Sequence, residues 1–397
     1  MKPGTARGSP AAPHRARMLR AIDEVDAAAW NGLAGTAQPF LRHEFLAALE
    51  QTGCVAPKLG WAPRHLLIDD AQGRLVGAMP LYLKGHSRGE FVFDFAWANA
   101  YHEHGLRYYP KLVAAVPFTP VTGARLLTAA DCDAAAVRGA LLAAAREHVR
   151  AEGLSSWHVL FPLDAELASL ERAQLIARRD CQFHWHNRGY GSFEAFLATF
   201  TAEKRKKAKR ERRRVAEAGI TFDTRHGGEI DGALWARLYE FYADTFHRHG
   251  HEPYLNLAFF RRIAAALPAS LMLKIARLGG EPIAVAIFFV GTDALYGRYW
   301  GAGGNYHSLH FEACYYQGID YCIERGLARF EPGTQGEHKV PRGFVPARTA
   351  SAHLIEDPRF AAAIRDFAAR EACSIDAYMA AVDEHVPYHR HTEELRL

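Results

Sequence analysis

The alternation of apolar and polar positions predicts short helices and strands that follow one another along the first half of the chain. In residues 39–49, apolar side chains at positions 41, 45, 46 and 49 recur at the spacing of a helix with one buried face. The run EFVFDFAWA at residues 90–98 is typical of a strand. The whole pattern predicts, in chain order, helices at 27–30 and 39–49, strands at 65–69, 74–83 and 90–98, a helix from Asp131 or Asp133 to near Gly153, a strand at 156–161, a helix at 165–177 and a strand at 181–190.

The second half repeats this order of elements. Residues 253–263, PYLNLAFFRRI, match residues 39–49, PFLRHEFLAAL, so that Phe259 falls where Phe45 does. Two strands around the turn LGGE follow, and then a third strand, ALYGRYWGA. A helix at residues 309–325 and the strand ARFEPGT complete the match. We therefore predict an internal duplication.

The duplication divides the chain into four parts. The boundary between the two copies falls where a long helix rich in basic residues is ended by Gly219. We predict a flexible tail at residues 1–18, a first domain at 19–190, a basic linker helix at 191–219 and a second domain at 220–397.

Composition indicates a globular protein in a reducing compartment. Of the 397 residues, 49% are hydrophobic and 23% are charged, which allows a sizeable core and excludes a mainly disordered chain. The longest apolar run, residues 283–290, is far shorter than the roughly 20 residues of a membrane span. The basic N-terminus lacks the apolar core of a secretory signal. Because the six cysteines are scattered without a CxxC pair, we expect a cytoplasmic protein without disulfides or structural zinc. The short apolar runs predict no transmembrane segment.

Charge is concentrated in one segment, KRKKAKRERRR, from Lys204 to Arg214, which we call the basic stripe. The net charge of +4 comes from 48 basic and 44 acidic residues, and the stripe alone holds nine Lys or Arg with Glu211 as its only acid. A helix with cations around it suits phosphate groups, as in tRNA, CoA, an acidic substrate or anionic lipid heads. A solvated linker helix is the alternative, and the lack of interleaved aromatic residues disfavours stacking on single-stranded nucleic acid.

Several stretches together resemble a known family over residues 20–385. They are YYPKLVAAVPFTPVTGARLL, the basic stripe, GRYWGAGG, LHFEACYYQGIDYCIERG and FEPGTQGEHKVPRGF. One repeat unit resembles the GNAT acyltransferase fold, and two in tandem resemble the Fem family and its bacterial Fem-like predicted N-acyltransferases. The resemblance implies an α/β (α+β) fold of two tandem GNAT-like domains with mixed sheets. It also implies an N-acyltransferase, related to peptidoglycan synthesis, that moves an acyl or aminoacyl group to an amine acceptor.

The resemblance further implies where the substrates bind. The donor, acyl-CoA or aminoacyl-tRNA, would sit on the second repeat as a substrate, with no tightly bound cofactor. The acceptor, a small-molecule or peptide amine, would occupy the cleft between the repeats, and tRNA could contact the stripe from Lys204 to Arg214. The absence of GxSxG, Walker and GxGxxG motifs disfavours hydrolases, kinases and dehydrogenases. The alternative is a non-catalytic protein that binds tRNA or another polyanion on a transferase scaffold.

A glycine-rich loop after the third strand of the second repeat is the first candidate site. GNAT-type transferases use such a loop, of the form [QR]xxGx[GA], to direct backbone N–H groups at a pyrophosphate before a helix N-terminus. The loop is lengthened here by GNYHSLH, and Fem-like enzymes bind no CoA at this place, so a simple glycine turn is the alternative. The candidates are Arg298, Gly301, Gly303 and Gly304 for the donor, and Trp300 for substrate.

The segment EPGTQGEHKVPRGF, which follows a buried-looking strand, is the second candidate. Ligands in α/β folds gather beside the carboxyl ends of strands, and acyl transfer to an amine needs a base and donors for an oxyanion. The segment resembles the Gly-rich, Lys-containing segment of the Fem family, although a solvated loop is the alternative. We assign Glu337 as base with His338 in reserve, Lys339 to the oxyanion or phosphate, Arg342 to the donor, and Glu331 and Gln335 to substrate contact.

The segment YHEHGLRYYPK occupies a comparable place in the first repeat. An HxH pair is a poor metal signal, so an aromatic and basic rim for the acceptor is the better hypothesis, and no metal is predicted. The same applies to His247, His249 and His251, which we expect in a loop beside the pocket of the second repeat. The rim residues are Tyr101, His102, His104, Tyr108, Tyr109 and Lys111. We expect this segment, Arg298 and the loop after Pro332 to face one cleft.

Overall fold

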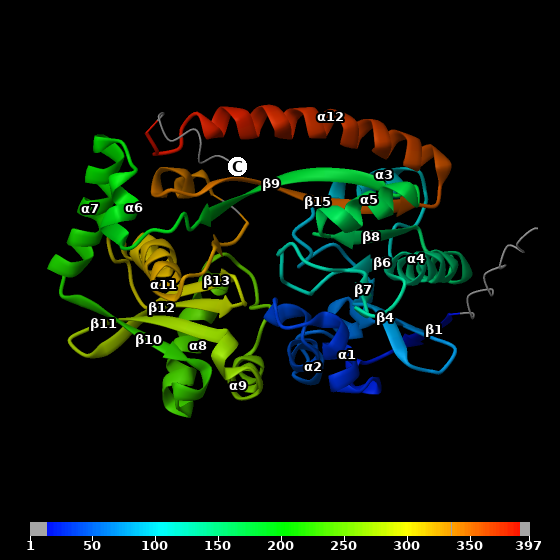
Figure 1. The fold of residues 1–397 in the computed structure, drawn as a ribbon, viewed down its shortest axis with the longest axis horizontal. Coiled ribbons are helices and arrows are strands. Elements are labelled where there is room, and N and C mark those ends of the chain that lie inside the picture. The colour runs from blue at the N-terminus through cyan, green and yellow to red at the C-terminus, as the bar shows by residue number, and fades with distance from the viewer. Residues whose placement is uncertain (1–13, 335, 390–397) are drawn as a thin grey trace, which may run out of the picture.

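The computed structural model describes residues 14–334 and 336–389 (Figure 1). Its strands are β1 (Arg15–Leu19), β2 (Trp61–Pro63), β3 (His65–Asp69), β4 (Leu75–Met79), β5 (Leu81–Lys84), β6 (Lys111–Ala114), β7 (Leu127–Thr128), β8 (Ser156–Leu160), β9 (Ile176–His186), β10 (Ile220–His226), β11 (Leu271–Leu278), β12 (Glu281–Val290), β13 (Ala294–Ala302), β14 (Arg329–Glu331) and β15 (Val345–Ile355). Its α-helices are α1 (Ala27–Ala34), α2 (His43–Gln51), α3 (Phe95–Glu103), α4 (Ala134–Ala151), α5 (Asp164–Arg172), α6 (Phe193–Ala198), α7 (Ala202–Glu217), α8 (Gly232–Arg248), α9 (Leu257–Ala266), α10 (Leu309–Phe311), α11 (Gln317–Arg325) and α12 (Pro358–Asp383).

Most strands belong to one mixed sheet that runs through both halves of the molecule. Its eleven strands have the order β10-β11-β12-β13-β14-β9-β15-β8-β6-β5-β2, and a second sheet has the order β1-β3-β4-β7. Two pairs are parallel, β6 with β8 and β13 with β14, while the other pairs in this sheet are antiparallel. Each half therefore contributes one parallel pair, which is the arrangement expected of two copies of one unit.

The two halves exchange strands. Strand β9 of the first half pairs with β14 of the second, and β15 of the second half pairs with β8 of the first. Between them, β9 and β15 run antiparallel with their register centred on Asp180 opposite Thr349. Figure 1 shows these two strands side by side beneath α12. Because β15 pairs with β8 of the first half, no single cut in the chain, at residue 190 or elsewhere, would divide the eleven-stranded sheet into two separate sheets.

One predicted strand is wrong. Residues 90–98 do not pair in a sheet, and α3 begins within them at Phe95. The strand that lies parallel to β8, as β13 lies parallel to β14, is β6. Alternation misled the prediction because the side chains of Phe93 and Phe95 are 55% and 45% exposed and line a cleft. The helix predicted to residue 177 ends at Arg172, since β9 begins soon after it.

The matching segments of the two halves pack against each other in a shared aromatic core. The ring of Phe45 on α2 lies 5.5 Å from that of Phe259 on α9 and 5.6 Å from that of Phe289 on β12. Phe40 adds contacts at 5.1 Å to both Phe289 and Tyr296. Since these buried rings come from both halves, burial of apolar surface fixes one half on the other.

Helix α7, which carries the basic stripe, lies on the second half. Its buried residues Ala208, Glu211 and Val215 recur at helical spacing, so one face packs while most of the basic side chains face outward. In Figure 1 the helix stands at the edge of the molecule beside α6. Gly219 follows it with φ of 74°, the left-handed conformation that ends helices. Within the described part of the chain, none of the helices is both long enough and apolar enough to span a membrane.

Candidate functional site

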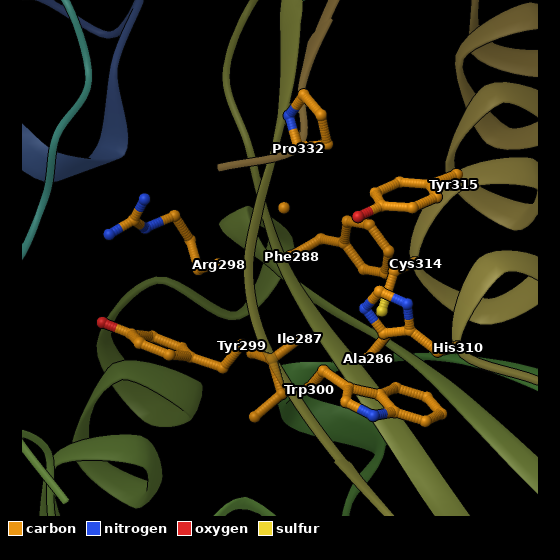
Figure 2. A pocket seen from close by; sticks show the side chains of 11 residues that line it. Ala286, Ile287, Phe288, Arg298, Tyr299, Trp300, His310, Cys314, Tyr315 and Pro332 are labelled. Carbon is orange, nitrogen blue, oxygen red and sulfur yellow. The ribbon is translucent and has the colours of Figure 1, made fainter. Parts of the chain in front are cut away.

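A cavity opens in the second half where β13 and β14 part. The two strands pair in parallel from Ala294 to Tyr296 only, and beyond this point β13 continues along β12. The divergence leaves a volume of about 140 Å³, which we call the second-half cavity (Figure 2). Its lining comprises Ala286, Ile287, Phe288, Gly297, Arg298, Tyr299, Trp300, His310, Cys314, Tyr315 and Pro332.

Arg298 lies at an irregularity of β13 beside this cavity. Gly297 pairs with Phe288 and Tyr299 with Ile287, so Arg298 is the extra residue of a β-bulge. Its guanidinium Nη2 donates a hydrogen bond of 2.5 Å to the backbone oxygen of Phe118 in the first half. Figure 2 shows Arg298 on the side of the strand opposite to His310 and Cys314. The bulge thus lets Arg298, which lines the cavity, reach the other repeat.

The opposite wall of the cavity is a helix with a widened turn. The helix predicted at residues 309–325 is present, with a π-helical segment from Glu312 to Tyr316. Such segments occur frequently at functional sites, and this one presents Cys314 and Tyr315 to the cavity. Burial raises the pKa of the Cys314 thiol, which therefore stays protonated, and burial lowers the pKa of His310 to about 4, which keeps it neutral.

Lys339 lies in a short 3₁₀ helix, Glu337–Arg342, close to the cavity. The residue is 2% exposed, and its Nζ donates a hydrogen bond of 2.6 Å to the backbone oxygen of Gly333. Burial lowers its pKa to about 7, and the charge of Arg298 acts in the same direction. At neutral pH the amine therefore exists in both protonation states.

His338 also reaches the cavity wall. Its Nε2 lies 2.7 Å from the hydroxyl of Tyr315, which lines the cavity. Burial lowers the pKa of His338, and the positive charges of Lys339 and Arg342 lower it further. The ring is therefore neutral at pH 7, and a neutral imidazole can accept a proton.

The remaining predicted residues of this loop anchor it. The exposed carboxylate of Glu337 accepts a hydrogen bond of 2.9 Å from Tyr378 on α12, so it faces that helix. Arg342 is buried and forms two hydrogen bonds, of 2.7 and 3.1 Å, with Glu211, the single acid of the basic stripe. Glu331 is buried and accepts a hydrogen bond of 2.8 Å from Arg329 Nε. Gln335 lies outside the described residues.

The predicted glycines have packing roles. A Cβ on Gly301 would lie 2.1 Å from the carbonyl carbon and oxygen of Phe241 on α8, and one on Gly303 would lie 2.7 Å from the ring of Phe241. A Cβ on Gly304 would meet the ring of Tyr306 at 3.2 Å. Close approach of α8 to β13 explains Gly301 and Gly303 without a ligand. A donor contact by these glycines stays a prediction, whereas Arg298 and Trp300 do line the cavity.

A larger cleft of about 860 Å³ lies between the two halves; we call it the inter-repeat cleft. Thr334 lines it, and Pro332, two residues earlier, lines the second-half cavity. Phe118 lines the cleft too, and its backbone oxygen accepts the hydrogen bond from Arg298. The cavity and the cleft are therefore neighbours, separated by the loop whose Gly333 binds Lys339. From the first half the lining includes Leu59, Trp61, His86, Ser87, Arg88, Phe91, Phe93 and Phe95, and from the second His251, Glu252, Pro253 and Tyr254.

The segment from Tyr101 to Lys111 reaches the cleft only indirectly. The ring of Tyr101 packs at 4.0 Å on Phe360 of α12, and the exposed His102 and His104 lie at the end of α3. The segment is connected to the inter-repeat cleft through Ser87, which lines the cleft. Ser87 Oγ lies 2.8 Å from Tyr109 Oη and 2.9 Å from Lys111 Nζ. These side chains therefore lie behind the cleft wall, and their contact with an acceptor stays a prediction.

Behind that wall lies a buried network of charged groups in the first half. Lys111 Nζ donates to Glu90 at 2.8 Å and also to Asp94, and Tyr108 donates to Asp94 at 2.6 Å. All four side chains are nearly inaccessible, and Lys111 pairs with both carboxyl groups, while Glu90 Oε1 and Asp94 Oδ1 have no hydrogen-bond partner among the described residues. This network holds Lys111 and Tyr108 behind the cleft wall, and a substrate contact of either residue stays a prediction.

The two-fold relation of β9 and β15 sets two buried pairs in matching places. His184 and His353 each lie four residues from the centre of the register. His184 lies 3.9 Å from Glu331, and the matching His353 lies 2.6 Å from His158 through their Nδ1 atoms. Burial lowers the pKa values of both His158 and His353, the latter to about 3.

The corresponding pair of parallel strands in the first half is β6 and β8. Around this pair the apolar side chains of Val113, Ala115, Leu160, Phe161 and Val92 pack together. Beside the second-half pair, β13 and β14, the cavity is instead lined by Arg298, Trp300 and Pro332 among others. Across the described residues, no group of three or more His, Cys, Asp or Glu is arranged to hold a metal ion.

Sequence reasoning missed the aromatic cleft and the helical wall of the cavity. Phe91 and Phe93 alternate as in a strand, so they were assigned to a sheet instead of a cleft. His310, Cys314 and Tyr315 fall on one side of a predicted helix. Polar side chains on the buried side of a helix are unusual, and this signal could have indicated the cavity.

Comparison with known families agrees with this architecture. A family model described as peptidoglycan biosynthesis/recognition, FemAB-like, matches residues 21–390. The chain belongs to the FemAB-like family. Among curated proteins, no sequence matches it.

Solved structures with similar folds include FemX and a domain from Agrobacterium fabrum. The FemAB-like chain is 11% identical to FemX, with 88% of this chain and 100% of that chain covered and a TM-score of 0.52. It is 10% identical to the C-terminal DUF2156 domain of an A. fabrum protein named as a lysylphosphatidylglycerol synthetase, with 87% and 96% covered and a TM-score of 0.54. A tandem GNAT protein from the clavulanic acid biosynthesis pathway is 13% identical, with 86% and 98% covered and a TM-score of 0.46. At these identities the likeness to FemX and to the A. fabrum domain concerns the fold, and it agrees with the predicted α/β fold with mixed sheets.

Proposed function

We propose that this FemAB-like protein transfers an acyl or aminoacyl group from an activated donor to an amine. The reactive end of the donor lies in the second-half cavity, and the amine enters from the inter-repeat cleft. The observation that carries the proposal is the position of Lys339, whose Nζ is bound to Gly333 between a residue that lines the cavity and one that lines the cleft.

The chemistry requires a proton acceptor and a partner for negative charge. The amine nitrogen attacks the donor carbonyl carbon, the C–N bond forms, and the carbonyl oxygen carries the negative charge of the tetrahedral intermediate. The bond to the leaving thiolate or ribose oxygen then breaks, and the proton lost by the nitrogen passes to a base or to the leaving group. With a pKa of about 7, neutral Lys339 can take that proton and charged Lys339 can stabilise the oxyanion.

The other two proposed catalytic residues are ranked by their contacts. His338 is the second candidate base, because it is neutral and binds Tyr315 of the cavity wall. Glu337 stays a prediction, and its exposed contact with Tyr378 favours it less than the two neighbours. Arg298 is proposed to position the donor carbonyl from the cleft side, since it lines the cavity and binds the first half.

The basic stripe supports a donor that carries phosphates. The cavity of about 140 Å³ is smaller than the roughly 300–1,000 Å³ of a pocket that encloses a whole drug-sized ligand, so only the acyl end fits. Outside it, α7 is tied to the site through Arg342–Glu211 and through Arg212, whose Nη2 lies 3.1 Å from Glu312 of the π-helical segment. Exposed cations on the same helix are placed to hold CoA phosphates or a tRNA backbone.

Amide formation with a defined donor tests the proposal. The full chain is incubated with acyl-CoA thioesters or with an aminoacyl-tRNA pool, each offered with one primary amine, and the amide is detected by mass spectrometry. The proposal predicts amide from at least one donor class, and amide formation slower by roughly 10²-fold or more with Lys339→Met. The alternative is a non-catalytic protein that binds polyanions through the exposed cations of α7. It is favoured if no donor gives amide while tRNA binds to α7.

A further inference from the structure

The wall of the inter-repeat cleft is dominated by aromatic side chains from both halves. The rings of Phe118 and Tyr254 are stacked with centroids 5.0 Å apart, and Trp61 meets Phe118 at 5.5 Å. Phe91 meets Tyr254 at 6.3 Å. Polar side chains, among them His86, Arg88 and Glu252, also line the cleft. Where an occupant packs against the rings themselves, hydrocarbon loses no hydrogen-bond partner, whereas a polar group would. The wall therefore favours an apolar occupant.

Two of these rings are held by unusual backbone. Phe91 has φ of 60° and Phe118 has φ of 57°, in the left-handed region that bulky side chains rarely adopt. Such conformations cost free energy, persist only where the surroundings enforce them, and cluster at ligand sites. Here both strained residues present their rings to the cleft.

The mouth of the cleft carries exposed apolar side chains. Leu59, Phe93 and Phe95 are 46%, 55% and 45% exposed, and all three line the cleft. The rings of Phe93 and Phe95 are stacked with centroids 6.4 Å apart. Few such side chains are so exposed elsewhere on the described surface, and a contiguous exposed apolar patch marks an interaction site.

From this mouth an apolar groove of about 450 Å³ continues between α3 and α12. Arg178 joins the two hollows, because its guanidinium donates to the Phe93 backbone oxygen at 2.8 Å and lies 5.3 Å from the ring of Trp97 and 5.7 Å from that of Phe367. Trp97 and Phe367 line the groove together with Ala96, Ala100, Phe360 and Ile364. Phe95 of the cleft and Ala96 of the groove are adjacent in the chain, so the two hollows are neighbours with Arg178 between them.

We infer that the acceptor is an amphiphile, a primary amine on a long hydrocarbon chain. The amine reaches Thr334 at the inner end of the cleft, the chain lies along Phe91, Phe118 and Tyr254, and its end passes Phe95 into the groove between α3 and α12. This inference rests on the proposed function for the direction of the amine, which must meet the donor at the second-half cavity. The binding of the chain itself needs no donor.

Displacement of a fluorescent apolar probe tests the inference without any transfer reaction. N-phenyl-1-naphthylamine is bound to the full chain, and dodecylamine, octylamine and butylamine are added below their micelle concentrations. We expect dodecylamine to displace the probe at more than about tenfold lower concentration than octylamine, because every buried methylene adds to the affinity, and butylamine to be ineffective.

Matched variants locate the site. Phe93→Ser combined with Phe95→Ser is expected to weaken dodecylamine binding about tenfold or more, and Phe367→Ser is expected to weaken dodecylamine more than octylamine. The control combines Leu163→Ser with Leu278→Ser, two residues that are 42% and 39% exposed away from the cleft, and should bind like wild type. Circular dichroism checks that every variant is folded.

Three results would overturn the inference. The first is equal affinity for dodecylamine and butylamine, and the second is equal loss in the control and in the phenylalanine variants. The third is binding to phosphatidylcholine vesicles that depends on Phe93 and Phe95 while dodecylamine displaces no probe, which would assign the patch to a bilayer. Amide formation with small amines under any of these results would leave the proposed function standing.

Discussion

The rings of Phe45 and Phe259 lie edge to face with centroids 5.5 Å apart, and these residues occupy matching places in the two repeats. The same relation holds in the sheet, where His184 and His353 stand at equal distances from the centre of the β9–β15 register. Residues related by the duplication therefore meet or mirror each other across one interface. It follows that the two copies form one packed unit, and the second-half cavity lies in the second copy, where its parallel strands part.

Gly301→Ala is expected to destabilise the fold. The new Cβ would lie 2.1 Å from backbone atoms of Phe241, which cannot move without shifting α8, so we expect a loss of about 1–3 kcal/mol in the free energy of unfolding. Gly139→Ala is the control, because its Cβ meets nothing within 4 Å on helix α4 and should stabilise by up to about 1 kcal/mol. Urea unfolding measures both, and an unchanged midpoint for Gly301→Ala would contradict the packing role.

Glu211→Ala is expected to cost about 3–5 kcal/mol of unfolding free energy, because Arg342 would remain buried without its partner. Glu217→Ala, on the same helix, removes an exposed pair with Arg213 and should cost only about 0.3–0.5 kcal/mol. Chemical denaturation of both variants makes the comparison. Equal losses would show that the Glu211–Arg342 pair does not hold the loop to α7.

Stability should fall as the pH falls below about 6.5. His353 and His158 have lowered pKa values in the fold, so the unfolded chain binds more protons between the folded pKa of about 3 for His353 and the usual value of 6.5. Each such group contributes a slope of up to about 1.4 kcal/mol per pH unit. His353→Gln should reduce the slope of unfolding free energy between pH 6 and 4, while the exposed His102→Gln should not. If the unfolding free energy of His353→Gln depended on pH as steeply as that of His102→Gln, buried His353 would not be a source of the pH dependence.

Replacing Lys206, Lys209 and Arg213 together with glutamate should weaken binding of tRNA or of a CoA thioester. These side chains are exposed on α7, so the fold is expected to be unchanged. If the basic stripe contacts phosphates, the logarithm of the binding constant should depend less steeply on salt in the variant, since fewer counterions are released. Filter binding of tRNA and titration with CoA at several salt concentrations measure this. A salt dependence equal to that of wild type would assign the stripe to a solvated linker.

Much of the fold could be predicted from local pattern. The match of residues 253–263 to 39–49 identified the duplication, and both segments are helical and packed together. The exchange of β9 and β15 could not be predicted, because a strand's own residues record which face is buried and not which half supplies its neighbour. Residues 90–98 were assigned to a strand because alternation cannot distinguish an aromatic cleft wall from a sheet.

The candidate site was only partly predictable for a similar reason. Lys339 and His338 were singled out by composition and resemblance, and the fold brings them to the cavity through Gly333 and Tyr315. Glu337 has the same character in the sequence, yet the turn of the 3₁₀ helix directs it to Tyr378. Neighbouring residues in a short helix face different directions, and which direction meets the cavity depends on tertiary packing.

Lys339→Arg separates the two roles proposed for the amine. Arginine keeps the positive charge that would stabilise an oxyanion but cannot accept a proton at neutral pH. We expect Lys339→Arg to retain more donor binding than Lys339→Met while losing the rise of the transfer rate with pH. Lys274→Met is the matched control, since Lys274 is also buried in the second half with a lowered pKa, but its Nζ lies 5.8 Å from the ring centroid of Tyr321, whereas Lys339 binds Gly333 between the cavity and the cleft.

The most direct measurement is the single-turnover rate of amide formation from pH 5.5 to 8.5 for wild type, Lys339→Met and Lys274→Met. With Lys339 as base, the wild-type rate should rise with pH and level off above about 7, where the amine is neutral. Lys274→Met should follow the same curve, and Lys339→Met should be slower by roughly 10²-fold or more without that rise. A wild-type rate and pH profile in Lys339→Met would remove Lys339 from the chemistry and contradict the account.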